Sequence, residues 1–171
     1  MKHRRTVECV TEDASVVVDD LSGAGEHEMR LHWLLPDLPY EVLSASPFCA
    51  TFSSEKGRFR WNIFSSSYGN AAIIRAGKNL SESKGREDED EDEDEDERLL
   101  GWESPTYGEL CPAISLLYRA RAPLPIRLVT VMLADERLQL QESPHELVLS
   151  RDGARVYQVS LTPEQAVGVT G

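Results

Sequence analysis

Short strand-like segments recur along almost the whole chain, and no ten-residue window has the apolar spacing of an amphipathic helix. In Glu28–Leu35, the apolar residues Met29, Leu31, Trp33 and Leu35 alternate with the other positions and would share one face of a strand. Turn residues separate such segments at intervals of about eight to twelve residues, a spacing typical of packed antiparallel sheets. We therefore predict an all-β fold, an antiparallel two-sheet β-sandwich.

Ten segments carry the strand signal, and two pairs of them are joined by tight turns. The first turn is Glu55-Lys56-Gly57 and the second contains Asp152-Gly153, and both are typical of antiparallel hairpins. In the strand at 58–65, the odd-numbered residues 59–63 are apolar and the even-numbered residues 58–62 are polar, which predicts one apolar and one solvated face. The predicted strands are 5–10, 15–20, 28–35, 48–53, 58–65, 70–76, 113–119, 125–133, 146–150 and 155–161.

Negative charge is concentrated in one stretch of the sequence. The chain has 171 residues, which predicts a single domain over 1–171, and a formal net charge of −12. Glu87–Glu97 is a run of eleven carboxylates, and without it the formal net charge of the chain would be about −1 (−12 + 11). Residues 78–98 lack any periodicity, so we predict a disordered, solubilising acidic insertion within the domain. Binding of calcium or of a basic partner is the alternative, although the run lacks the glycine turn and ligand spacing of an EF-hand.

The ends and the hydropathy of the chain exclude several classes. No apolar stretch approaches the ~20 residues of a membrane helix, so we expect no membrane insertion. The basic start Met1–Arg5 is followed by polar Thr6–Asp13, which predicts that the chain has no signal peptide. Because Arg5–Val10 already has strand character, we expect a truncated or mis-started reading frame. The acidic charge disfavours nucleic acid as a partner.

Cysteines and histidines do not form a metal-binding pattern. Cys9, Cys49 and Cys111 are far apart without a C-x-x-C pair, and their apolar neighbours predict buried thiols in the core. His27 and His32 are five residues apart on a predicted strand, which places them on opposite faces. We therefore predict neither a metal site nor a cofactor site from these residues.

Three segments resemble, in order, the C-terminal part of the heparinase II/III-like polysaccharide lyases. They are VVVDDLSG at 16–23 with GEHE at 25–28, RLHWLLP at 30–36, and GWESPTYGE at 101–109. The last is the most specific of the three. The resemblance extends roughly over Arg4–Leu133 and implies a supersandwich-like arrangement of the two sheets.

The resemblance also implies an activity for the parent protein. Lyases of this family cleave uronic-acid polysaccharides by β-elimination, which needs a positioned base and a group that neutralises the carboxylate. In the family these groups lie mainly in an N-terminal α/α toroid, and further histidine and zinc-binding residues precede the segment at which this chain begins. We therefore assign no catalytic residue, metal ligand or cofactor to this chain. The implied partner is the toroid of a parent lyase, and the implied location is the periplasm or cell envelope.

Two groups of residues are candidates for contact with a glycan. Trp102 and Tyr107 lie in a segment rich in Gly, Ser and Pro, where aromatic rings can stack on sugars; the alternative is a packed corner with Trp102 in the core and Gly108 in a turn. Arginines could also line a groove for an acidic polysaccharide, or could simply occupy solvated strand faces. They are Arg58, Arg60, Arg119, Arg121 and Arg127.

Together these patterns predict the C-terminal β-sandwich portion of a heparinase II/III-like lyase, which supports the catalytic domain and has no turnover of its own. A stand-alone carbohydrate-binding or protein-interaction module is the main alternative. A degraded gene remnant is the third. The polysaccharide substrate and the oligomeric state are not encoded in any of these patterns.

Overall fold

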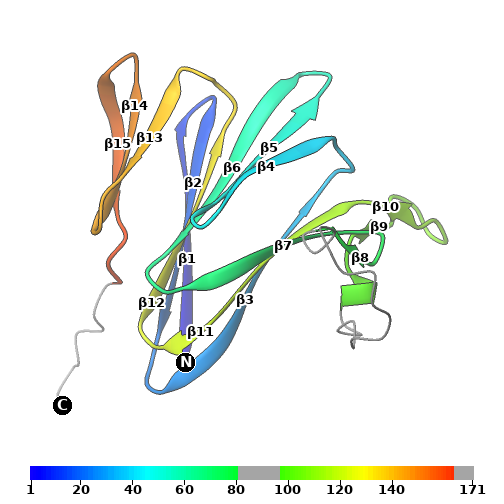
Figure 1. The fold of residues 1–171 in the computed structure, drawn as a ribbon, viewed down its shortest axis with the longest axis horizontal. Coiled ribbons are helices and arrows are strands. Elements are labelled where there is room, and N and C mark those ends of the chain that lie inside the picture. The colour runs from blue at the N-terminus through cyan, green and yellow to red at the C-terminus, as the bar shows by residue number, and fades with distance from the viewer. Residues whose placement is uncertain (81–96, 164–171) are drawn as a thin grey trace. The chain divides into compact units, whose positions relative to one another are not determined.

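The computed structural model of the chain describes residues 1–80 and 97–163 and consists of strands and one short 3₁₀ turn (Figure 1). The all-β, sandwich-like prediction is confirmed. In these two ranges no helix is long and apolar enough to cross a membrane. The elements are β1 (Lys2–Thr11), β2 (Ala14–Ser22), β3 (Glu26–Leu35), β4 (Tyr40–Ala45), β5 (Phe48–Ser54), β6 (Gly57–Ser65), β7 (Gly69–Arg75), β8 (Lys78–Asn79), η1 (Glu97–Leu99), β9 (Trp102–Glu103), β10 (Cys111–Pro112), β11 (Ile114–Pro123), β12 (Ile126–Leu133), β13 (Leu138–Glu142), β14 (Glu146–Arg151) and β15 (Ala154–Ser160).

The chain divides into two compact units. The first contains Met1–Glu28, Tyr40–Gly69 and Ala120–Gly171, and the second contains Met29–Pro39 and Asn70–Arg119. Of the predicted acidic insertion at 78–98, residues 81–96 lie outside the described residues. Its two ends belong to regular elements, since β8 and η1 fall within the predicted range.

The first unit contains a six-stranded sheet in the order β1-β2-β12-β6-β5-β4 and a three-stranded sheet in the order β13-β14-β15. Central strand β12 pairs antiparallel with both β2 and β6. Val129 and Thr130 are adjacent on β12 and point to opposite faces, yet both are buried. Burial on both faces explains why the sequence of β12 is a nearly continuous apolar run.

One face of the six-stranded sheet packs on the three-stranded sheet through a single apolar core. Val131 of β12 lies between Val16 of β2 and Asn62 of β6. The apolar side chains of Val131 and Val16 therefore meet on this face, beside the amide of Asn62. Leu138, Leu147 and Leu149 of the small sheet complete it. The whole cluster consists of Ala14, Val16, Val18, Phe64, Val129, Val131, Leu133, Leu138, Leu147, Leu149 and Leu161.

The prediction that β6 has one solvated face holds at Arg58, which is exposed, and is wrong at Asn62, which is buried. Asn62 and Phe64 lie on the face that was expected to be wet, and both are buried. The amide of Asn62 donates a hydrogen bond to the Val131 carbonyl at 3.2 Å, which satisfies a polar group inside the core. The alternation within one strand does not reveal that β13–β15, more than seventy residues later, cover its polar positions.

The two predicted hairpins of this unit are present. Ser54 pairs with Gly57 across the β5–β6 turn. Arg151 pairs with Ala154 across the β14–β15 turn, where Asp152 and Gly153 have φ values of 52° and 81°. Two consecutive positive φ values characterise the type I′ turn, for which Asp-Gly is a preferred sequence.

The second unit is built on a sheet in the order β3-β11-β7-β8 and on the short ribbon β9–β10. On β3, Met29, Leu31 and Leu35 are buried and Trp33 is half-buried, so the predicted apolar face is confirmed. The adjacent isoleucines Ile73 and Ile74 of β7 are both buried, as expected for a strand covered on both faces.

Candidate functional site

The two aromatic residues predicted to contact sugar lie in one loop of the second unit but in different environments. Trp102 pairs with Pro112 at the base of the β9–β10 ribbon and is half-buried. Tyr107 lies in the connecting loop and is fully exposed, with a relative accessibility of 107%. Only Tyr107 therefore presents its whole ring to solvent, and Trp102 is partly packed.

Short-range hydrogen bonds shape this loop. The Thr106 carbonyl accepts bonds from the Ser104 hydroxyl at 2.9 Å and from the Glu109 amide at 3.2 Å. Gly108 has a φ of 83°, so it occupies the turn conformation that the packed-corner alternative assigned to it. Glu103 and Glu109 flank Tyr107, and residues 102–112 contain no Lys or Arg. Two carboxylates and no cation make this loop unfavourable for an anionic ligand.

A buried polar network holds the base of the ribbon. The Gly101 amide donates to the Ser115 hydroxyl at 2.8 Å, and the Gly101 carbonyl accepts bonds from the amides of Ala76 and Ala113, both at 2.8 Å. The His32 Nε2 atom lies 2.8 Å from the same Ser115 hydroxyl. Burial lowers the pKa of His32, so the neutral ring can accept the proton of the Ser115 hydroxyl.

The distance between Ser115 and His32 is that of a nucleophile and its base, but the Ser115 hydroxyl is not accessible from solvent. Ser115 has 0% exposed surface, so no substrate reaches its hydroxyl. The Ser115 oxygen also accepts the Gly101 amide proton. We interpret the pair as a structural support for the ribbon.

The last carboxylate of the acidic run, Glu97, is part of the same unit and is buried. It forms an ion pair with Arg119 at 2.7 Å and accepts a hydrogen bond from the Asn79 amide at 3.1 Å. One end of the run is thus a fixed structural contact, and Arg119 is engaged in it. Nothing in the sequence distinguishes Glu97 from the ten carboxylates before it.

Arg127, which was considered for a groove, is a structural residue of the first unit. It is buried and donates to both carboxylate oxygens of Asp20, at 2.6 and 2.9 Å. Burial raises the pKa of Asp20, but the hydrogen bonds from Arg127 and Arg4 outweigh it and leave this pKa below its ordinary value. The solvated-face alternative is therefore wrong for Arg127, because Arg127 is buried and pairs with Asp20 of the adjacent strand β2.

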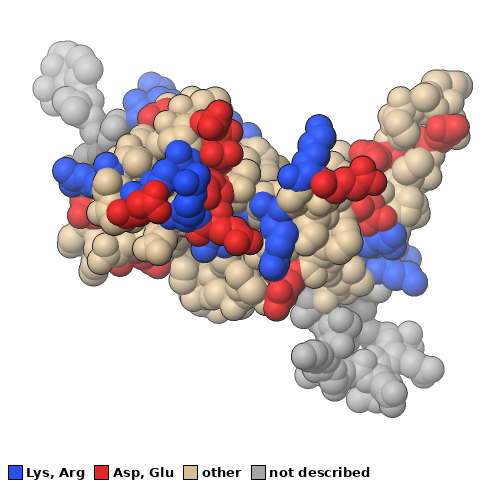
Figure 2. All heavy atoms as spheres, turned by 90° about the horizontal axis from the view of Figure 1, so that it is seen from above, with Lys and Arg blue, Asp and Glu red and all other residues tan. Residues whose placement is uncertain are grey.

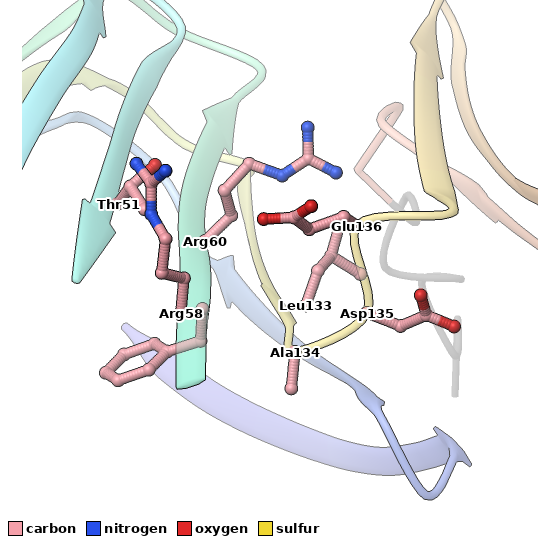
Figure 3. Close-up of a pocket in the computed structure, with 8 residues that line it drawn as sticks. Thr51, Arg58, Arg60, Leu133, Ala134, Asp135 and Glu136 are labelled. Atoms are coloured by element: carbon pink, nitrogen blue, oxygen red, sulfur yellow. The ribbon is translucent and has the colours of Figure 1, made fainter. Parts of the chain in front are cut away.

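Arg58 and Arg60 both line a pocket of about 190 Å³ in the first unit, but Arg58 extends toward Thr51 and Arg60 toward Glu136 (Figure 3). Arg60 lies opposite both Thr51 of β5 and Leu133 of β12, so these side chains share one face of the sheet. The connection after β12 supplies the opposite wall. The lining residues are Thr51, Arg58, Phe59, Arg60, Leu133, Ala134, Asp135 and Glu136.

The charges of this pocket are unequally neutralised. The Asp135 carboxylate lies 2.8 Å from Arg137 and 3.3 Å from Arg151, and the hydrogen bond from Arg137 lowers its pKa. Arg60 donates to the Leu138 carbonyl at 2.6 Å, and no carboxylate among the described residues lies within 4.0 Å of its guanidinium. In Figure 3, Arg60 and Glu136 extend into the opening, whereas the Asp135 carboxylate points away from Arg60. Sequence analysis missed Thr51, Asp135 and Glu136, because nothing in the sequence indicates which loop approaches β6.

Elsewhere the charged surface is mixed. Figure 2 shows Lys and Arg side chains next to Asp and Glu side chains on the visible face. Arg121 lies 3.4 Å from Glu26, and both are exposed. Exposed pairs of this kind partly cancel each other's field and do not form a positive groove.

Histidines and cysteines are dispersed over the described parts of the chain. Among the described residues, no group of three or more His, Cys, Asp or Glu side chains could hold a metal ion. His3 lies 2.7 Å from the buried carboxylate of Asp19, and His27 bonds to the carbonyl of Ala24. The prediction of buried thiols is wrong for Cys9, which is exposed on the edge strand β1, and Cys49 and Cys111 are only half-buried.

Solved structures of two lyases share this arrangement of strands. A heparinase III superposes with a TM-score of 0.64 at 15% identity, over 92% of this chain and 23% of its own. A heparan sulfate lyase from Pedobacter heparinus gives 0.61 at 12% identity, over 96% of this chain and 24% of its own. The chain has the fold of one part of these lyases. It spans about a quarter of their length.

Neither the models of known protein families nor the curated proteins include a match to this chain. At 12 to 15% identity, the likeness establishes the fold and does not transfer residue roles. It agrees with the family whose motifs the three segments at 16–28, 30–36 and 101–109 resemble.

Proposed function

We propose that this chain is the C-terminal β-sandwich portion of a polysaccharide lyase similar to the heparinase II/III-like family. In this proposal the chain supports an N-terminal α/α toroid that carries the catalytic residues, and it has no turnover of its own. The observation that carries the proposal is the unequal coverage of the structural likeness. Almost all of this chain superposes on the solved lyases, but only about a quarter of each lyase is matched.

The state of the reactive side chains supports a non-catalytic role. A general base must reach the proton that it abstracts. Here the ring of His32 is bonded to a fully buried serine, and His3 is held against Asp19. Tyr68 and Tyr107 are exposed, but they lie in open loops without a described cationic partner to neutralise a uronate carboxylate.

A lyase assay tests this proposal. The purified chain is incubated with heparin, heparan sulfate and alginate, with and without zinc, and the absorbance of the unsaturated uronate product is followed. We expect no product in any sample. Product formation would overturn the proposal and would direct mutagenesis to Tyr107, His32 and Tyr68.

A stand-alone carbohydrate-binding or protein-interaction module is the second candidate, and the exposure of Tyr107 favours it. Aromatic rings on protruding loops are common contacts for sugars and for proteins. Retention of the chain on immobilised heparin or alginate, lost in Tyr107→Ala but kept in Tyr68→Ala, would support this candidate. The supporting role predicts that neither substitution changes retention.

A further inference from the structure

We propose that the pocket beside Arg60 binds one acidic sugar unit, with its carboxylate or sulfate on Arg60 and its hydroxyls on Glu136. That the ligand is a sugar rests on the proposed function. That it has both an anionic group and hydroxyl groups is inferred from the residues of the pocket.

Arg60 supplies the anion-binding side, and Arg58 adds a second positive charge nearby. A guanidinium offers five N–H donors in a planar fork, and the described contacts of Arg60 use one of its nitrogens, on the Leu138 carbonyl. Arg58 is only loosely paired, at 3.8 Å from the exposed carboxylate of Glu41. Guanidinium groups pair with carboxylates and sulfates in a bidentate manner, so an oxyanion can use the donors that remain.

Glu136 supplies the hydroxyl-binding group. Asp135, its neighbour, is engaged by Arg137 and Arg151, so it contributes little free negative charge to the pocket. Glu136 has no described ion pair, and Figure 3 shows its carboxylate on the side of the opening that Arg60 enters. A carboxylate accepts hydrogen bonds from hydroxyl groups and repels a second anion. The pocket is therefore suited to a ligand with an anionic end and a hydroxyl-bearing end.

Size limits the ligand to one unit. The pocket holds about 190 Å³, which is smaller than the roughly 300–1,000 Å³ of sites for drug-sized ligands. A longer glycan would have to continue outside the pocket. We accordingly expect a dissociation constant on the order of 1 mM for a monosaccharide.

A titration of the full chain with small ligands tests the proposal. Glucuronate and glucose 6-sulfate each carry an oxyanion and hydroxyls, acetate carries only the oxyanion, and glucose carries only hydroxyls. Amide chemical-shift changes at Thr51, Arg60 and Glu136 report binding at the pocket. We expect glucuronate or glucose 6-sulfate to bind at least about tenfold more tightly than acetate or glucose. Whichever of glucuronate and glucose 6-sulfate binds more tightly identifies the carboxylate or the sulfate as the preferred group.

Four variants make the test specific. Arg60→Lys keeps the charge but loses the fork, and we expect roughly tenfold weaker binding of the preferred acid. Arg58→Gln should weaken it by about twofold to fivefold, and it keeps the test available if Arg60→Lys does not fold. Glu136→Ala should weaken binding of the sugar acid but not of acetate. Arg155→Gln, an exposed residue of β15 outside the pocket, is the matched control and should change nothing.

Equal binding of all four ligands, or unchanged binding in Arg58→Gln and Arg60→Lys, would overturn the proposal. Because these titrations need no turnover, they are independent of the lyase assay. Product formation by the chain would contradict the proposed function without affecting the result of the pocket titration. Absence of ligand binding at the pocket would contradict the pocket proposal without affecting the supporting role.

Discussion

The two compact units of this chain are stabilised in different ways. The first unit has an apolar core between its six-stranded and three-stranded sheets, built from branched aliphatic side chains. Both units also bury polar groups that have specific partners, among them Asn62 in the first and Ser115 in the second. The second unit differs in its close backbone approaches, because an added Cβ at Gly77 or Gly101 would lie within 3.0 Å of backbone atoms. The first should therefore respond mainly to lost volume, and the second most strongly to added atoms at its close backbone contacts.

The closest backbone approach of the second unit gives the largest expected effect. Gly101 has a φ of 76°, and an added Cβ would lie 2.6 Å from the Ala76 nitrogen and 2.7 Å from the Ile74 oxygen. Because backbone atoms cannot move aside cheaply, we expect Gly101→Ala to lower the free energy of unfolding by more than about 4 kcal/mol. Urea unfolding followed by circular dichroism measures this.

Gly108 provides the matched control for Gly101. Its φ of 83° is similar, but an added Cβ would meet nothing within 4 Å. Gly108→Ala should then cost only the strain of a left-handed alanine, about 1–2 kcal/mol. Equal losses in both variants would show that backbone strain, and not the close approach, determines the stability of this region.

A volume change in the first unit comes next. Leu149 is buried between the two sheets, and Leu149→Ala removes its side chain from the apolar core. We expect a loss of about 2–5 kcal/mol in the free energy of unfolding, measured by urea denaturation. Leu43→Ala, at an exposed position of β4, should stay within about 0.5 kcal/mol of the wild type. A loss below 1 kcal/mol for Leu149→Ala would contradict the account of this core.

The polar network of the second unit should be less costly to break than the core of the first. Ser115→Ala leaves the Gly101 amide without its hydroxyl acceptor, and we expect a loss of about 1–3 kcal/mol. Ser104→Ala removes an exposed hydroxyl in the same unit and should cost less than about 0.5 kcal/mol. If the two serine variants had equal stability, the buried network would not contribute to the stability of the second unit.

The smallest expected effect is a pH dependence from His32. Its folded pKa is lowered by burial, so the unfolded chain binds a proton at a higher pH than the folded chain does. Stability from the neutral ring is present above the unfolded pKa of about 6.5 and is lost as the pH falls through the folded pKa. His32→Gln should reduce this loss in unfolding experiments at about pH 7.5 and about pH 5.5. An NMR titration that placed the His32 ring at or above the ordinary histidine pKa would refute the assignment.

Local patterns were sufficient to predict most strands of the fold. The alternation in β3, the apolar run of β12 and the Asp152-Gly153 turn each depend on neighbouring residues only, and each is found as predicted. Strands β4 and β13 were missed, as were the two-residue strands β8, β9 and β10. Exposed residues dominate β4, and β13 has a single fully buried residue, Leu138, so neither presents a clear alternation.

The candidate sites depend on contacts between distant parts of the sequence, and these were mostly not predictable. Arg60 meets the 134–136 connection only because β12 pairs with β6 and then leads into β13. The pairing of Glu97 with Arg119 and the burial of Ser115 likewise depend on how strands come together. Residue type alone singled out Arg58, Arg60 and Tyr107, but it could not distinguish the solvent-facing Tyr107 from the partly packed Trp102.

The most direct test of the central claim is product formation by the chain alone and in complex with the protein encoded immediately upstream in the same direction. The two are co-expressed, purified through a tag on this chain, and assayed with acidic polysaccharides for the unsaturated uronate product. The account predicts a stable complex with lyase activity and no product from the chain alone. Turnover by the isolated chain, or an upstream protein that is active and does not bind it, would contradict the supporting role.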